Sequence, residues 1–200
     1  MPRWPIGSSR MGRSSNRGYG IIPAHMILPI ETYGSERLRV TARKVAVTPE
    51  LAALAESMLE TMYKAKGVGL AAEQIGRDEA LCVIDVPLSC EDDEEVKAFN
   101  AQTVQPLVMF NPEIVASSGE QTGREGCLSL PNVGGEVTRP AEVTVQYLDI
   151  KGVPQIATVR GFLARAVCHE TDHLKGILYV DHMDEKARDK VIKKLKKNSK

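Results

Sequence analysis

The residues of this chain most able to do chemistry are two histidines, a glutamate and a cysteine. His169 and His173 stand four positions apart with Glu170 between them, and Cys127 lies upstream in Glu-Gly-Cys-Leu-Ser. Side chains at i and i+4 of a helix project from the same face, so both imidazoles can reach one metal ion. A catalytic metal site needs three protein ligands and an open position for water. Cys127, His169 and His173 supply that number, and we predict a catalytic metal centre.

The chemistry that this set predicts is hydrolysis. A bound metal lowers the pKa of its water toward neutrality and makes hydroxide available as a nucleophile. Glu170 is placed to take the water's proton and later to pass it to a leaving amine. The alternative is structural, with Cys127 packed as a small free cysteine and the histidines without a ligand role.

The other three cysteines are predicted to take no part in this site. No pair among the four has C-x-x-C spacing, which favours reduced thiols over a disulfide framework. Cys168 is next to His169, but one residue along a helix turns it about 100° away, so we expect it in the core. Cys82 is expected in a buried strand and Cys90 at the surface.

A glycine-rich segment from Gly67 to Gln74 reads Gly-Val-Gly-Leu-Ala-Ala-Glu-Gln. It lacks the G-K-[ST] of a phosphate loop, so a phosphate site is a weak reading. Small residues let a substrate backbone approach closely, and the Gln74 amide can donate to an oxyanion. The alternative is a plain turn that ends a helix.

Composition and charge set the frame for these motifs. The 200 residues are 42% hydrophobic and 26% charged, as in a globular protein of one domain. Basic and acidic residues balance at 26 each, so net charge offers no argument for DNA or a membrane as partner. No apolar run approaches the ~20 residues of a membrane span.

The two ends of the chain differ in composition from its middle. Residues 1–25 hold four arginines and no acid. We expect a disordered leader there, either an organellar transit peptide or residues ahead of a true start at Met26. Residues 186–200 hold eight basic residues and one acid, and we expect a basic C-terminal helix or tail. The domain between them is expected at 26–185.

The first element that must position these motifs is a helix. Thr48 is a suitable N-cap, Pro49 a suitable first residue, and Gly67 a suitable end. Between them runs an apolar stripe at helical spacing, more typical of core than of a binding site, made of Leu51, Leu54, Met58, Leu59 and Met62.

The remaining elements are short strands followed by the motif helix. We expect a solvated loop or insertion at 89–105 and a helix at 162–175 that Gly176 ends. Strands are expected at 81–86, 107–110, 143–148 and 155–159, the last two paired through a turn. This order predicts an α+β fold, with short antiparallel strands packed around a central C-terminal helix that carries the H-E-x-x-H motif.

Three motifs together resemble the peptide deformylase family. Residues 67–74 are similar to its G-x-G-L-A-A-x-Q, residues 125–129 to E-G-C-L-S, and residues 169–173 to H-E-x-D-H. They occur in the family's order, and the resemblance covers roughly residues 27–185. It implies an enzyme that removes the N-formyl group from formyl-methionyl nascent peptides and releases formate.

The resemblance also implies a role for each site residue. Cys127, His169 and His173 would hold Fe²⁺ physiologically, or Zn²⁺, Ni²⁺ or Co²⁺ in preparations. Gln74 and the Leu128 backbone N–H would stabilise the oxyanion while Glu170 moves the proton. The substrate contacts would come from Val68, Gly69 and Gly126 on its backbone and from Phe162 and Ala166 around the methionine. Glu125 would pair with Arg139 to brace the ligand loop.

The chain departs from the family pattern at one position. Gly134 stands where many members carry an arginine that reaches the substrate peptide, which leaves contacts beyond methionine unassigned. At the C-terminus, a basic helix like that of several deformylases would contact the ribosome through Lys186–Lys200. The alternative is a solvated helix end. The resemblance implies a cytoplasmic enzyme, or an organellar one if residues 1–25 are a transit peptide.

Two other functions fit parts of the pattern. An H-E-x-x-H endopeptidase would need a third ligand further along the chain, but Tyr179 stands where a histidine is expected and only Glu185 follows. A structural metal module that binds ribosomes without catalysis would have no use for Glu170 and Gln74.

Overall fold

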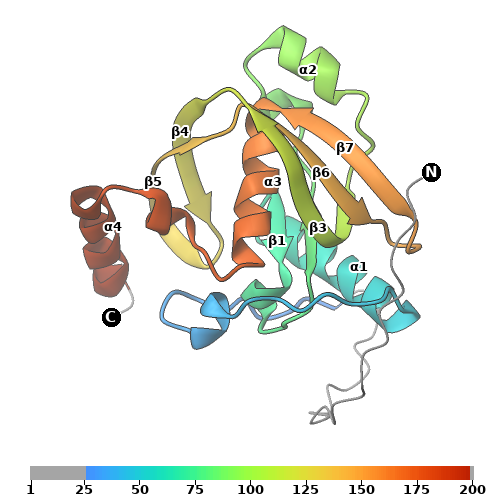
Figure 1. Ribbon diagram of the computed structural model, residues 1–200. Helices are drawn as coiled ribbons and strands as arrows, with labels where there is room; N and C mark the ends of the chain where they lie inside the picture. The colour runs from blue at the N-terminus through green and yellow to red at the C-terminus, as the bar shows by residue number, and fades with distance from the viewer. Residues whose placement is uncertain (1–25, 199–200) are drawn as a thin grey trace.

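The chain folds into two antiparallel sheets with one helix, α3, lying between them (Figure 1). The computed structural model describes residues 26–198, so the predicted leader at 1–25 lies outside the described residues. The five-stranded sheet has the order β1-β2-β3-β6-β7, and β4 pairs with β5. This confirms the predicted α+β class and its antiparallel strands. Within residues 26–198, no helix is long and apolar enough to cross a membrane.

The elements have the following bounds. The α-helices are α1 (Pro49–Lys64), α2 (Glu94–Asn100), α3 (Gly161–His173) and α4 (Glu185–Asn198). The strands are β1 (Gly69–Ala71), β2 (Leu81–Ile84), β3 (Leu107–Ser118), β4 (Gln121–Cys127), β5 (Leu130–Arg139), β6 (Glu142–Leu148) and β7 (Pro154–Arg160). Short 3₁₀ helices are η1 (Glu36–Arg39), η2 (Ala72–Ile75), η3 (Leu88–Cys90) and η4 (Tyr179–His182).

Helix α1 begins and packs as its sequence predicts. The Thr48 side chain accepts a hydrogen bond from the Leu51 N–H, and Pro49 is the first helical residue. The predicted stripe is core, because Leu54, Met58 and Met62 are buried. They pack in one cluster with residues of the five-stranded sheet, among them Leu70, Leu81 and Phe110.

Helix α3 packs on the other face of the same sheet. Successive residues of a strand point to opposite faces. In β2, Leu81 and Val83 therefore join the α1 cluster, while Cys82 and Ile84 join the cluster around α3. Cys82 and Cys168 are buried and Cys90 is exposed, as predicted. The hairpin of β6 and β7 is also confirmed, with Val145 opposite Ala157.

The segment 89–105, predicted as a solvated loop or insertion, is only partly so. Residues 92–95 of its acidic run are exposed, but the segment contains the end of η3 and all of α2, and Glu91 is only 6% exposed. The Glu91 carboxylate accepts hydrogen bonds from the N–H groups of Phe162 and Leu163, at 2.9 and 3.0 Å. It therefore caps the first turn of α3, whose N–H groups have no partner within the helix. The side chain of Asn100 donates to the same carboxylate at 3.0 Å.

Two further expectations need correction. The strand predicted at 107–110 continues through Asn111 and Pro112 to Ser118, with irregular register on β6. Asn111 does not end the strand. Its side chain accepts a hydrogen bond from the Val45 N–H at 2.8 Å and donates one to the Val45 carbonyl oxygen at 2.7 Å. The β4–β5 pair was not predicted, since its strands carry glycines and charges in place of a clear apolar alternation.

Replacing Glu91 tests whether a distant carboxylate holds the start of α3. Glu91→Ala should lower the free energy of unfolding by about 1–3 kcal/mol, because it removes a buried cap with three donors. Urea unfolding followed by circular dichroism measures this. Glu95→Ala, at an exposed position of α2, is the control, and equal stability of the two variants would contradict the capping role.

Candidate active site

The structure brings Cys127, His169 and His173 together from two elements. Cys127 is the last residue of β4, and both histidines lie on the final turns of α3. Their ligand atoms all lie within 4.8 Å of one another, and the Cys127 Sγ is 3.3 Å from the His173 Nε2. One thiolate and two imidazoles are a donor set that suits Zn²⁺ and Fe²⁺. The cluster could therefore hold a metal ion.

The buried carboxylate of Glu125 orients the first histidine. It lies 3.0 Å from the His169 Nδ1, while Arg139 donates to it at 2.9 and 3.1 Å and Arg165 at 2.9 Å. A hydrogen bond at Nδ1 leaves Nε2 free for a metal. The predicted pair of Glu125 and Arg139 is thus present, and Arg165 is an addition that sequence reasoning missed.

The same contacts decide the protonation of Glu125. Burial raises its pKa, but the hydrogen bonds from His169 and Arg139 lower it more, to about 2. The carboxylate is therefore charged at neutral pH. For His173, burial and the neighbouring His169 hold the pKa well below its usual range, which favours the neutral form that binds metals.

Asp172 has a part in the site that sequence reasoning did not assign. Its carboxylate accepts hydrogen bonds from Arg139 and, at 2.7 Å, from the His182 Nε2. Arg139 thus links Asp172 at the end of α3 to Glu125 on β4. The arrangement ties both ligand-bearing elements to one guanidinium.

Gln74 is held with its amide nitrogen toward the cluster of Cys127, His169 and His173. Its Oε1 accepts from the Ala71 N–H at 2.8 Å, so its Nε2 faces the other way. That Nε2 donates to the Ser129 Oγ at 3.2 Å and to the Cys127 Sγ at 3.4 Å. The Gln74 Nε2 is therefore fixed on the side of Cys127 and Ser129.

Glu170 lies beside this cluster, against Gly69. It is buried, its Oε2 has no hydrogen-bond partner among residues 26–198, and burial raises its pKa to about 7. A Cβ at position 69 would lie 2.2 Å from the Glu170 Oε1. Glycine in β1 thus leaves the room that the Glu170 carboxylate occupies.

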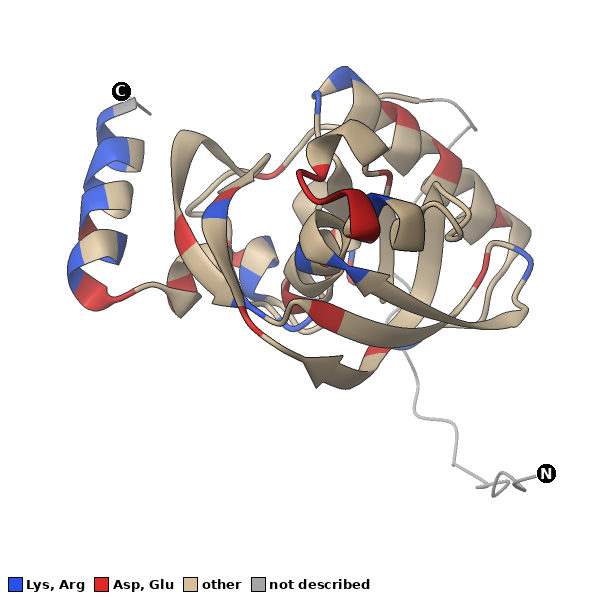
Figure 2. Cartoon of the chain, turned by 90° about the horizontal axis from the view of Figure 1, so that it is seen from above, with Lys and Arg blue, Asp and Glu red and all other residues tan. Residues whose placement is uncertain are grey.

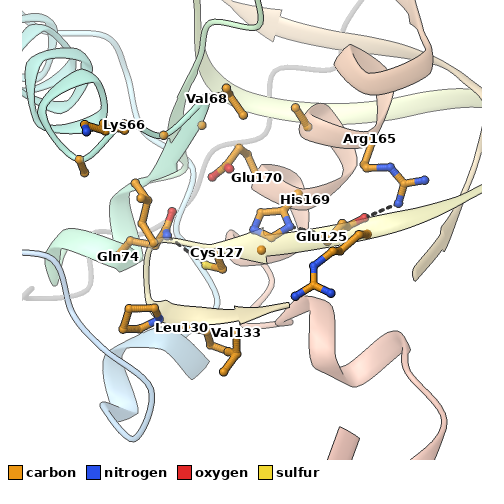
Figure 3. Close-up of a pocket in the computed structure, with 18 of the residues that line it drawn as sticks. Lys66, Val68, Gln74, Glu125, Cys127, Leu130, Val133, Arg165, His169 and Glu170 are labelled. Atoms are coloured by element: carbon orange, nitrogen blue, oxygen red, sulfur yellow. Dashed lines mark hydrogen bonds and ion pairs between the residues drawn. The ribbon is translucent and has the colours of Figure 1, made fainter. Parts of the chain in front are cut away.

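All the predicted substrate contacts line one cavity of about 470 Å³ (Figure 3). Its walls include Val68, Gly69, Gly126, Leu128, Phe162 and Ala166, together with Gln74, Cys127, His169 and Glu170. His173 is not among the lining residues and is 1% exposed, so within the cluster it is the member farthest from the open cavity. The cavity also has Lys66 and Arg124 in its wall, which sequence reasoning missed although each adjoins a motif.

Two sequence alternatives can be compared with this geometry. Tyr179, at the position of a third histidine, is buried and stacks on His169 with 6.2 Å between ring centroids. Cys127 stands as the third member of the cluster instead. Among the described residues, no contact at this site favours the endopeptidase or the structural metal module over the predicted site.

Comparison with known proteins finds one family that matches most of the chain. The family described as polypeptide deformylase matches residues 27–189. The peptide deformylase of Chlorobium limicola is 43% identical over 171 residues, which are 85% of this chain and 88% of that protein. The one from Lachnoclostridium phytofermentans is 45% identical over 156 residues, 78% of this chain and 88% of that one.

Solved structures agree with the sequence relatives. The crystal structure of a peptide deformylase from Ehrlichia chaffeensis superposes with a TM-score of 0.79 at 35% identity, covering 86% of this chain and 97% of that one. A peptide deformylase from Legionella pneumophila gives 0.75 at 39% identity, covering 86% and 95%.

Neutralising Glu125 should lower both the stability of the fold and the affinity of the site for a metal ion. We expect Glu125→Gln to lower the free energy of unfolding by about 3 kcal/mol, because two arginines stay buried with less compensation. It should also reduce metal affinity roughly 10–100-fold, because His169 loses its orienting carboxylate. Chelator competition and urea unfolding measure the two effects.

The pH dependence gives this prediction a second readout. The lowered pKa of Glu125 means that its stabilisation is complete above the ordinary value of 4.5 and is lost as pH falls toward about 2. The stability difference between wild type and Glu125→Gln should narrow over that range. Glu120→Gln, at an exposed position, is the control, and a pH-independent difference would contradict the assignment.

Proposed function

Since this chain belongs to the polypeptide deformylase family, we propose that Cys127, His169 and His173 hold the metal ion of its active site. The chain is an enzyme of this family, a hydrolase that removes the N-formyl group from nascent peptides. The observation that carries the residue assignment is the convergence of these three ligand atoms beside Gln74 and Glu170.

The metal is a divalent ion, and we propose Fe²⁺ as the physiological one. The same three ligands accept Zn²⁺, Ni²⁺ and Co²⁺, because the ion that occupies such a site depends on metal availability and geometry as well as on affinity. When bound, the ion supplies Lewis acidity and brings the pKa of water toward neutrality.

Glu170 acts as the proton carrier in this proposal. Its carboxylate accepts the proton of the attacking water and later gives it to the leaving amine. A pKa near 7, raised by burial, suits a group that must do both at neutral pH. The Gln74 Nε2 and the Leu128 backbone N–H donate to the oxyanion that develops on the formyl oxygen.

The substrate binds in the cavity as an added strand. Val68, Gly69 and Gly126 face its backbone, and small residues allow main-chain hydrogen bonds at close range. Phe162 and Ala166 on α3 contact the methionine side chain. Peptide deformylases from Ehrlichia chaffeensis and Synechococcus elongatus have been solved in complex with actinonin, and we expect the same cavity to bind it here.

The catalytic domain is proposed to span 26–185, with the basic segment 186–200 as a ribosome contact. Helix α4 packs on β5 through the buried side chains of Val191 and Leu195. Its lysines lie on the outside, as the blue face in Figure 2 shows. A rigid basic face attracts phosphates, which supports contact with ribosomal RNA. We propose a cytoplasmic location for this activity.

The catalytic assignment is tested by formate release from a formyl-methionyl tripeptide. The Fe²⁺ enzyme, prepared anaerobically, should release formate, and chelated apoenzyme should not. Glu170→Ala should keep its metal and lose about 10²–10⁴-fold in kcat, because proton transfer is removed. Glu113→Gln, at an exposed position, is the control. Normal turnover by Glu170→Ala would defeat the proton role, and no turnover by fully loaded wild type would defeat the site.

Ribosome contact is tested by charge, since deleting α4 would uncover apolar surface on β5. The triple variant Lys193→Glu, Lys196→Glu, Lys197→Glu should co-sediment with ribosomes at least tenfold more weakly than wild type at low salt. Lys64→Glu, at an exposed position on α1, is the control. Equal co-sedimentation of all three proteins would exclude α4 as the contact.

A further inference from the structure

Two cations at the mouth of the active-site cavity have no ionic partner among residues 26–198. Lys66 and Arg124 both line the cavity and both are exposed. Lys66 follows the end of α1, and Arg124 lies on β4. In the described part of the chain, neither the Lys66 ammonium nor the Arg124 guanidinium makes a hydrogen bond or an ion pair within 4.0 Å. Exposed cations without partners in a binding site are available to a ligand.

No exposed acid among the lining residues balances these cations. The lining residues include two carboxylates, Glu125 and Glu170, which are 5% and 4% exposed. Glu125 is already shared by Arg139 and Arg165. Glu136 faces Arg124 in the β4–β5 ladder without forming an ion pair. The two exposed charged side chains of the cavity wall are therefore both cations.

Arg124 also occupies the space over Gly134. A Cβ at position 134 would lie 3.1 Å from the Arg124 Nε and 2.6 Å from the carbonyl oxygen of Glu125. The Glu125 carbonyl oxygen thus leaves no room for a side chain at position 134. Arg124, on the facing strand β4, lines the cavity, and Gly134 does not.

The two cations reach the cavity wall from different segments of the chain. Lys66 precedes the glycine segment that continues into β1, and Arg124 immediately precedes Glu125 and Gly126. Figure 3 shows Lys66 on the side away from Glu125, with Cys127 and Gln74 between them. An extended peptide advances about 3.3 Å per residue and alternates its side chains. A peptide bound in the cavity would therefore present successive side chains to walls that include Lys66 and Arg124.

We propose that Lys66 and Arg124 select formyl-methionyl peptides with acidic side chains at the second or third residue. This inference rests on the proposed function and deepens it, because it assigns the contacts beyond methionine. Acidic side chains would be attracted by both cations, and lysine side chains repelled. The effect falls on substrate binding, so it should appear in KM more than in kcat.

The test compares matched tripeptide amides on the Fe²⁺ enzyme. Formyl-methionyl peptides carry glutamate, alanine or lysine at the second or at the third position. At low salt, the glutamyl peptides should exceed the lysyl peptides roughly three- to tenfold in kcat/KM, as expected of partly exposed charge pairs. The preference should shrink in about 1 M salt, where the Debye length is about 3 Å.

Charge reversal then assigns the effect to these residues. Arg124→Glu and Lys66→Asp should each weaken the preference, and together they should invert it. Aspartate is chosen at position 66 because the residue has a φ of 58° there, which aspartate tolerates better than most residues. Lys64→Glu is the matched control, since Lys64 is exposed nearby and does not line the cavity. It should keep the wild-type preference.

A binding measurement separates this inference from the proposed function. Dissociation constants of dansylated methionyl peptides without the formyl group, measured on Zn²⁺-loaded wild type, should show the same order. If the alanyl peptide is turned over but the glutamyl and lysyl peptides have equal dissociation constants, the inference is overturned and the proposed function stands. If no peptide is turned over, the proposed function fails, and the dissociation constants by themselves decide the inference.

Discussion

The buried carboxylate of Glu125 is the interaction on which the rest of the site depends. It takes hydrogen bonds from His169, Arg139 and Arg165, and so joins β4, β5 and α3. A charge this deeply buried is costly to desolvate and is tolerated only when donors surround it. Here the donors include His169, one of the three residues whose ligand atoms converge. The electrostatic requirement of one side chain therefore also sets the orientation of His169.

Helix α3 is held at both ends by residues from other elements. Glu91, ahead of α2, caps its first turn, and Arg139 binds Asp172 in its last turn. Between these anchors it packs on the five-stranded sheet. A helix held in this way presents His169, Glu170 and His173 in one position, which spares the site the entropy of orienting them.

Two glycines near the cavity lie against charged side chains. Gly69 leaves room for the Glu170 carboxylate, and Gly134 leaves room for the Arg124 guanidinium. A Cβ at position 69 would displace the Glu170 carboxylate, and a Cβ at position 134 would clash with the Glu125 carbonyl oxygen and crowd Arg124. The glycines thus shape the electrostatics of a site whose chemistry lies in other side chains.

The sequence by itself determined the α+β class, the start of α1 at Thr48, the hairpin of β6 and β7, and the motifs of the site. These depend on local patterns, such as a capping hydroxyl, apolar periodicity, or two histidines one helical turn apart. Only the tertiary structure decided that Glu91 is buried, that Arg165 shares Glu125, and that Lys66 and Arg124 line one cavity. An acidic run gives no local sign that one member turns inward to cap a helix distant in sequence. The partners of a charge are chosen across space, and spacing along the chain does not encode them.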